Sequence, residues 1–94
     1  MQISRTFLRI KYHSEFAKHY NKKIAPSSKL VTQFKNRLEL FIEDSKNPIL
    51  KDHQLKGKRS EYRAFSITGD VRAVYKIVED KLWLYDVGTH NQVY

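Results

Sequence analysis

Imidazole, guanidinium and ammonium groups gather in the second half of this chain, and their types define the chemistry that the sequence could support. His53 lies in a cation-rich linker, and His90 follows Gly88 just past the last strand-like run. Histidine is the natural proton carrier near neutral pH. The planar guanidinium of Arg72 suits the oxygens of a phosphate better than an ammonium does. These residues are therefore candidates for proton transfer beside a bound phosphate.

The same residues also have plainer interpretations. An isolated exposed histidine is usually incidental, and a histidine in a loop is usually only solvated. Arg72 could form a cross-strand ion pair with Asp70 or Asp86, and Asp70 is of a type that turns favour. Asp70 could also orient a histidine. The residue types alone leave both kinds of role open.

The net charge of the chain favours a polyanionic partner. Eighteen Lys and Arg stand against 10 Asp and Glu among 94 residues, which gives a formal net charge of +8. On so small a surface this charge indicates a nucleic acid or an acidic protein as partner, although some small basic domains carry such a charge without one. The cations of the linker, which could grip phosphates, are Lys51, Lys56, Lys58 and Arg59.

Length and composition bound the remaining classes. The sequence predicts one domain over residues 1–94. No apolar run approaches ~18 residues, and the N-terminus lacks a continuous apolar signal core, so we expect a cytoplasmic protein without a membrane span. There is no cysteine, the four histidines show no close ligand spacing, and we expect His13 and His19 on the surface. No metal site and no cofactor are predicted.

Three strand-like runs over residues 61–94, separated by Gly69-Asp70 and Glu79-Asp80, predict an antiparallel meander. A two-residue turn at Glu79-Asp80 gives the meander one aliphatic face and one face of cations and aromatics. The aliphatic face pairs Ile77 with Leu82 and Tyr75 with Leu84, and the other face pairs Lys76 with Trp83, Val74 with Tyr85 and Arg72 with Val87.

The turn around Gly69 sets the register of the first run. A two-residue loop would place Phe65 and Ile67 on the cationic face, whereas a three-residue loop over 68–70 places them in the core. We favour the second register because it keeps large apolar side chains out of water. It sets Ser66 beside Arg72 and turns Arg63 toward the helices, where Glu39 and Glu43 are its candidate partners.

The first half of the chain predicts the layer that covers the aliphatic face. A strand over 4–12 precedes a helix that begins at Ser14 as N-cap and ends at Ala25-Pro26. A second amphipathic helix follows over about 29–45, with Leu40 outside its apolar stripe. We therefore predict an α+β fold in the order β-α-α-β-β-β. A helical hairpin packs on one face of a small, mainly antiparallel, twisted sheet, and the partner of the first strand is left open.

Several motifs in this order and spacing resemble those of the RelE superfamily of bacterial toxins, in particular its YafQ-like branch. The motifs are Asp52-His53-Gln54-Leu55-Lys56-Gly57, Glu61-Tyr62-Arg63, Asp70-Val71-Arg72-Ala73-Val74-Tyr75-Lys76-Ile77 and Gly88-Thr89-His90. The resemblance covers the second half closely and the helical half in layout. Where that branch has a further histidine this chain has Ser66, and where it has a tryptophan after the aspartate this chain has Val71.

The resemblance implies a RelE-like toxin of a type II toxin–antitoxin system that cuts translated mRNA in the ribosomal A site without a metal. It implies a cognate antitoxin, the 70S ribosome and mRNA as partners, with the toxin alone a monomer and a hetero-oligomer formed with the antitoxin. By position it implies functional roles for His53, Asp70, His90 and Tyr94, and Arg72 matches an arginine of RelE-type relatives. Together with the residue types, this gives His90, His53, Arg72 and Asp70 as catalytic candidates, and Lys56, Lys58, Arg59, Ser66, Lys76 and Tyr94 as candidate substrate contacts. Two other functions stay open: a ParE-like poison of DNA gyrase with the same fold, and a non-catalytic basic RNA-binding or repressor module.

Overall fold

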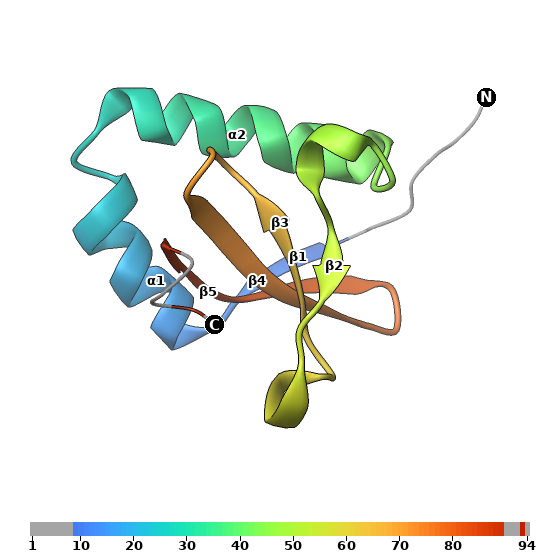
Figure 1. The fold of residues 1–94 in the computed structure, drawn as a ribbon. Helices are drawn as coiled ribbons and strands as arrows, with labels where there is room; N and C mark the ends of the chain where they lie inside the picture. Colours follow the sequence, from blue (N-terminus) through green and yellow to red (C-terminus); the bar gives the residue numbers. More distant parts are fainter. Residues whose placement is uncertain (1–8, 90–92, 94) are drawn as a thin grey trace.

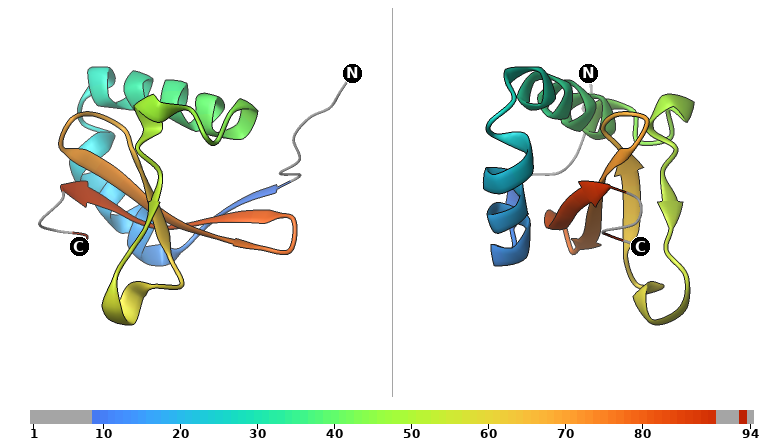
Figure 2. Two further views of the ribbon diagram at one scale, coloured as in Figure 1. Left: turned by 45° about the vertical axis from the view of Figure 1, so that its right-hand side comes forward. Right: turned by 60° about the vertical axis from the view of Figure 1, so that its left-hand side comes forward.

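The computed structural model of the protein describes residues 9–89 and residue 93. Two helices lie on one face of a five-stranded sheet (Figures 1 and 2). The helices and strands are β1 Arg9–Tyr12, α1 Ser14–His19, a π-helical turn Tyr20–Ile24, α2 Ser28–Glu43, β2 His53–Gln54, β3 Arg63–Ser66, β4 Val71–Val78 and β5 Lys81–Thr89. Short 3₁₀ turns, η2 Pro48–Leu50 and η3 Gly57–Arg59, flank β2. The predicted fold class and the helical hairpin are confirmed.

Side-chain caps explain where the two helices begin. The Ser27 hydroxyl accepts a hydrogen bond from the backbone N–H of Leu30 at 3.2 Å, which satisfies a free donor at the start of α2. At the start of α1 the N-cap is His13, whose Nδ1 accepts from the N–H of Glu15 at 3.2 Å. The prediction of Ser14 as N-cap is therefore wrong by one residue, because the imidazole nitrogen takes the acceptor role.

The strands are ordered β1-β5-β4-β3-β2, and every neighbouring pair is antiparallel except β1 with β5. The first strand, whose partner the sequence left open, lies parallel to β5 and sets Ile10 opposite Leu82. The short strand β2 adds an edge to β3, with His53 opposite Ala64. It lies in the segment that the sequence predicted only as a linker, so the sheet gains one strand.

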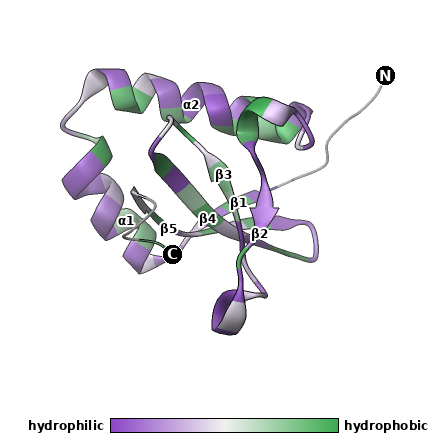
Figure 3. Ribbon diagram, viewed as in Figure 1, coloured by the Kyte–Doolittle hydropathy of each residue, from purple (hydrophilic) through white to green (hydrophobic). Residues whose placement is uncertain are grey.

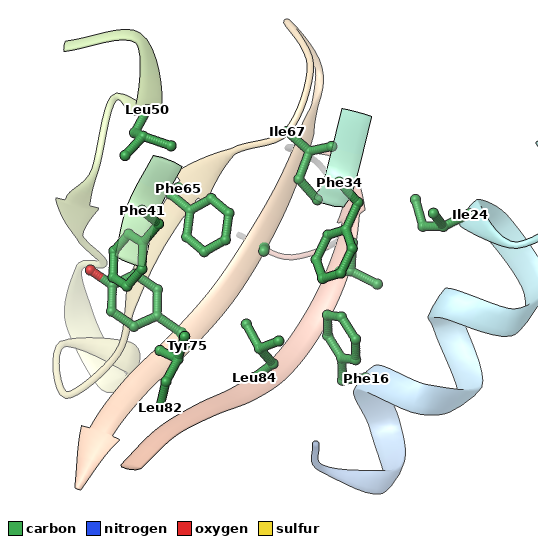
Figure 4. Packing of buried hydrophobic residues seen from close by; sticks show 12 residues of the cluster. Phe16, Ile24, Phe34, Phe41, Leu50, Phe65, Ile67, Tyr75, Leu82 and Leu84 are labelled. Carbon is green, nitrogen blue, oxygen red and sulfur yellow. The ribbon is translucent and has the colours of Figure 1, made fainter. Parts of the chain in front are cut away.

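The main core lies between the helices and the sheet (Figure 4). Phe41 of α2 stacks on Phe65 with ring centroids 4.9 Å apart and meets Tyr75 edge-on at 4.8 Å. Leu82 and Leu84 of β5 are fully buried beneath the same layer. The helices thus cover the face predicted as aliphatic at Tyr75, Leu82 and Leu84, since the burial of these side chains drives the packing. Ile77, predicted on the same face, is 44% exposed.

The three-residue loop predicted at the first turn is confirmed. Phe65 pairs with Ala73 and Ser66 with Arg72. The N–H of Ile67 donates to the carbonyl of Val71 at 2.8 Å, which leaves residues 68–70 as the loop. Phe65 and Ile67 are both fully buried.

The register predicted between β4 and β5 is wrong beyond Tyr75. A β-bulge inserts Tyr85, so that Val74 lies opposite Asp86 and Arg72 opposite Gly88. The extra residue turns Val87 onto the helical face, where it is fully buried beside Ala73. A bulge shifts the alternation of side chains by one place, and here the shift removes a large apolar side chain from water.

A second, smaller core covers part of the opposite face of the sheet, which we call the outer face. Leu55, Ala64, Val74 and Val93 are buried there, and Tyr62 and Tyr85 pack against them. Residues from the linker and from the C-terminal end therefore lie over the middle of the outer face, while Arg72 and His53 lie around this cluster.

Candidate nucleic-acid interface

Arg72 lies on the outer face at the start of β4, and its guanidinium is held by the neighbouring turn. Its Nη1 donates to the Ser66 hydroxyl at 3.2 Å and to the carbonyls of Thr68 and Gly69 at 3.3 Å each. Its Nε is buried and has no hydrogen-bond partner among the described residues. Within the described part of the chain, Arg72 forms no ion pair, so the predicted alternative of a cross-strand pair with Asp70 or Asp86 is not found. The guanidinium is fixed in place, and no carboxylate within residues 9–89 pairs with it.

Ser66, predicted as a substrate contact, lies beneath this guanidinium. Its side chain is 3% exposed, and its hydroxyl donates to the Thr68 carbonyl while it accepts from Arg72. Its geometry is that of a residue that positions Arg72, and its contact with substrate stays a prediction. Asp70 is exposed in the same turn, where Thr68 Oγ1 accepts from the N–H groups of Asp70 and Val71. This hydroxyl shapes the turn.

His53 reaches the outer face from β2. It is exposed, and its Nδ1 lies 2.9 Å from the Lys51 carbonyl, which fixes the ring. His53 pairs with Ala64 of β3, and Ala64 pairs with Val74 of β4. His53 is therefore separated from Arg72 by two strand spacings across the sheet and by two residues along β4. Strand geometry puts the two Cα atoms roughly 12 Å apart. The structure thus brings both residues to one face, but not into direct contact.

Three of the linker cations, Lys56, Lys58 and Arg59, lie at η3, a hydrophilic projection at the lower end of the sheet (Figure 3). Lys51 lies apart from them, at the end of η2. Lys56 and Lys58 are exposed at η3. Arg59 donates a hydrogen bond from Nη1 to the Val93 carbonyl and so ties η3 to the C-terminal end of the chain. This projection presents several positive charges beside the outer face.

Lys76, the remaining predicted contact on β4, is held by its neighbours. Its ammonium is 2.7 Å from Glu61 Oε1 and 5.8 Å from the centre of the Tyr62 ring. The hydrogen bond to Glu61 raises the pKa of the Lys76 ammonium. Part of its charge is therefore compensated, in contrast to that of Arg72.

His90 and Tyr94 lie outside the described residues, so the structure does not test their predicted roles. His90 is the residue after Thr89, and Thr89 pairs with Val71, the neighbour of Arg72. The sequence therefore attaches His90 to the end of β5 that lies beside Arg72.

Sequence reasoning missed a polar network on the helical side of the sheet. Asp52 accepts a hydrogen bond from the Tyr75 hydroxyl at 2.6 Å and two from the Arg63 guanidinium at 3.3 Å. Burial and the hydrogen bond to Asp52 raise the pKa of the Tyr75 hydroxyl. Arg63 does turn toward the helical side, but its partner is Asp52 and neither Glu39 nor Glu43.

His19 is a second residue whose place differs from the prediction. It is half-buried, and its Nδ1 is 2.6 Å from Asp86 Oδ1. The bulge in β5 places Asp86 where α1 can reach it, and a bulge leaves no clear signal in the sequence. His19 thus joins α1 to β5 and is not a free surface residue.

Within residues 9–89 and 93, no three His, Asp or Glu side chains are grouped so that they could hold a metal ion. Over the same residues, no helix has the length and apolar character needed to cross a membrane.

Two helices on a five-stranded, mainly antiparallel sheet form a fold that a toxin of the YoeB/ParE type shares. The chain belongs to the YafQ family, bacterial toxins of type II toxin–antitoxin systems, whose model matches residues 8–94. A search of curated proteins found no match.

Solved structures of other toxins share the fold. In the Escherichia coli DinJ–YafQ complex, the matching chain is 22% identical, with 97% of this chain and 99% of that chain covered and a TM-score of 0.75. A metal-bound toxin from Helicobacter pylori is 26% identical, and the match covers 93% of this chain and 99% of that chain with a TM-score of 0.69. A YoeB/ParE toxin from Agrobacterium tumefaciens is 16% identical, and the match covers 88% of this chain and 99% of that chain with a TM-score of 0.75.

Proposed function

We propose that this toxin is a ribosome-dependent endoribonuclease that cuts translated mRNA in the A site. The observation that carries the proposal is the Arg72 guanidinium, fixed on the outer face by Ser66 and the turn carbonyls and paired with no carboxylate in the described ranges. Such a group matches the equatorial oxygens of a phosphate under attack, where negative charge develops.

The reaction needs a base, an acid and a cation around one ribose–phosphate link. A base takes the proton of the 2′-hydroxyl, whose oxygen attacks the adjacent phosphorus. The bond from phosphorus to the 5′-oxygen then breaks, and an acid gives that oxygen a proton. We assign the two proton transfers to His90 and His53, without deciding which is base and which is acid, because imidazole is poised for both near neutral pH. Asp70 orients an imidazole in this scheme, and no metal takes part.

The remaining predicted residues bind the RNA. Lys56 and Lys58 at η3 hold backbone phosphates, Arg59 beside them contacts the RNA, and Lys76 adds charge on β4. Tyr94 stacks on a base of the codon. In the cytoplasm a cognate antitoxin would neutralise the toxin in a hetero-oligomer, as the relative YafQ of E. coli is found with DinJ. The free toxin is a monomer in this proposal.

Primer extension on a reporter mRNA during induced expression tests the proposal, with wild type, His90→Ala and Arg72→Ala side by side. Cuts within codons of translated frames are expected for wild type and should be lost in both variants. Because a H. pylori relative is metal-bound, the cleavage is repeated on purified ribosomes with a chelator that takes transition metals and spares Mg²⁺. Cutting that continues in His90→Ala, or that stops with the chelator, would contradict the respective assignment.

The fold alone does not decide between a nuclease and a gyrase poison, since a YoeB/ParE toxin shares it. The same induction therefore needs a readout of the DNA-damage response. Damage signalling without mRNA cuts would replace the nuclease with a ParE-like activity. Absence of toxicity, with RNA binding that depends on salt, would indicate the non-catalytic module.

A further inference from the structure

A cleft of about 270 Å³ lies at the outer face, between the start of α1, the η3 segment and the bulge of β5. Aromatic rings form one side of it. Tyr62 and Tyr85 meet edge to face with centroids 4.8 Å apart, and the His13 ring lies 5.2 Å from Tyr85. The ring centroid of Trp83 lies 6.0 Å from that of Tyr85. Each ring is thus held by another, so the cleft has a preformed aromatic wall.

The bulge in β5 explains why these groups converge. It sets both Tyr85 and Asp86 against the single residue Val74 of β4. Asp86 is engaged within the protein, because its Oδ1 accepts from the Val87 N–H at 2.8 Å and lies 2.6 Å from His19 Nδ1. Tyr85 keeps its ring along the cleft. A bulge often serves to re-aim a side chain, and here it aims an aromatic ring.

Opposite charges lie at the rim of this aromatic wall. Glu15, in the first turn of α1, has a side chain that is 54% exposed, and its Oε1 lies 3.8 Å from His19 Nε2. Arg59 lines the cleft from η3 and uses Nη1 on the Val93 carbonyl, so its other N–H groups can serve a ligand. A carboxylate at the rim disfavours a phosphate, and an aromatic wall favours a flat ring.

The cleft is close to the proposed scissile phosphate. Val74 lines it, and Arg72 is two residues further along the same face of β4, about 7 Å away by the rise of a strand. That distance corresponds to one or two nucleotides of a single strand. A base that enters the cleft would therefore belong to a nucleotide next to the one cut at Arg72.

We propose that this cleft is a specificity pocket for one mRNA base, with the base against Tyr85 and its hydrogen-bond donors on Glu15. The proposal rests on the function proposed above. A carboxylate accepts hydrogen bonds only. Guanine offers it two adjacent donors, adenine and cytosine offer one exocyclic amino group, and uracil offers a ring N–H between two carbonyls that repel it. Arg59 can in addition donate to the guanine O6 and N7. The expected order of preference is guanine, then adenine and cytosine, then uracil.

The first test measures cleavage by purified toxin on 70S ribosomes whose A-site codon is varied one base at a time. Wild type should cut guanine-containing codons about 5- to 150-fold faster than the uracil counterparts at one codon position, the range of one good base contact. Glu15→Gln should reduce this ratio toward one. Glu39→Gln, an exposed carboxylate on α2, is the matched control and should keep it. An unchanged ratio in Glu15→Gln would overturn the pocket.

The second test asks whether the ring stacks on the base. Tyr85→Leu should slow cleavage of all codons, whereas Tyr85→Phe, which keeps the ring, should not. Tyr85 packs on the smaller core, so Tyr85→Leu could fail to fold, and its thermal unfolding is recorded. If it does not fold, the base preference of Glu15→Gln, a change at an exposed residue, tests the pocket. Equal rates for folded Tyr85→Leu and wild type would overturn the stack.

A nucleotide-binding measurement distinguishes a wrong assignment of the pocket from a wrong assignment of the nuclease activity. Trp83 is the single tryptophan, and it lies beside Tyr85. Titration with 5′-GMP should change its fluorescence to saturation, and 5′-UMP should do so more weakly, whether or not the toxin cuts mRNA. No difference between the nucleotides would overturn the pocket, even if wild type cleaves. Loss of antitoxin binding in Glu15→Gln, with unchanged base preference, would assign the cleft to the protein partner instead.

Discussion

Single side chains decide how Arg72 is presented, and Ser66 is the most direct test of this. Its hydroxyl lies 3.2 Å from Arg72 Nη1 and is 3% exposed. Ser66→Ala should lower the cleavage rate about tenfold by loosening the guanidinium, and should change the free energy of unfolding by only about 1 kcal/mol, the scale of one hydrogen bond. Single-turnover cleavage and urea unfolding measure the two effects. Ser60→Ala, at an exposed position, is the control, and a cleavage rate that Ser66→Ala leaves intact would contradict the positioning role.

Tyr75 allows a second test at this scale, through pH. Burial and the hydrogen bond to Asp52 raise the pKa of its hydroxyl above the ordinary value of 10.0. The folded protein therefore binds this proton more tightly than the unfolded chain. The stability that this raised pKa contributes is complete below about pH 10 and is lost as the pH rises through the folded pKa. Over that range the free energy of unfolding falls by up to about 1.4 kcal/mol per pH unit.

Tyr75→Phe removes this dependence. The variant should be less stable than wild type by about 1–2 kcal/mol at pH 8, because Asp52 loses a buried donor. Its free energy of unfolding should also fall less steeply than that of wild type between pH 10 and 11. Urea unfolding across that pH range measures both. Parallel curves for the two proteins would show that folding does not raise the pKa of this hydroxyl.

At the scale of elements, His19 joins α1 to β5 through Asp86, with 2.6 Å between Nδ1 and Oδ1. His19→Ala should lower the free energy of unfolding by about 1–2 kcal/mol, since the half-buried carboxylate loses its partner. Lys18→Ala, the exposed neighbour on the same helix, should change it by less than about 0.5 kcal/mol. Equal effects in the two variants would mean that the contact contributes nothing to the packing of α1.

The elements also show which parts of the fold a sequence predicts. Alternation along β3 and β4 predicted the register of Ser66 with Arg72, because burying Phe65 left one energetically sound choice. The bulge at Tyr85 had no such signal. An extra residue in β5 becomes favourable only once Val87 can enter the core beside Ala73, and that gain depends on tertiary packing.

The candidate site likewise has parts that the sequence predicts and parts that depend on tertiary structure. Residue types and motif order predicted that Arg72, His53 and the linker cations gather on one surface. Whether Asp52 or Glu39 would meet Arg63 depended on a turn at Lys51, whose φ of 49° lies in the left-handed region. Such a backbone conformation is unusual for a lysine, and nothing in the sequence pattern announces it. The aromatic cleft depends on the bulge in β5, so the sequence did not predict it either.

At the scale of the whole molecule, the charge of +8 raises the question of whether RNA binding is general or confined to the outer face. Single-stranded RNA releases counterions in proportion to the phosphates neutralised, with a slope of about 0.7 per phosphate in log K against log salt. If Lys56 and Lys58 each hold a phosphate, Lys56→Gln/Lys58→Gln should reduce that slope by about 1.4 and weaken binding at low salt.

The matched control is Lys29→Gln/Lys35→Gln, which changes two exposed lysines of α2, in the helical layer. Both double variants lower the formal charge from +8 to +6 (8 − 2 = 6), so a purely global field predicts the same loss for each. Fluorescence anisotropy of a labelled single-stranded RNA, titrated at several salt concentrations, compares the slopes. Directed binding at η3 requires a smaller slope only for the Lys56 and Lys58 pair. Equal slopes for the two variants would mean that the protein attracts RNA by net charge alone, and the phosphate contacts assigned to η3 would then have no support.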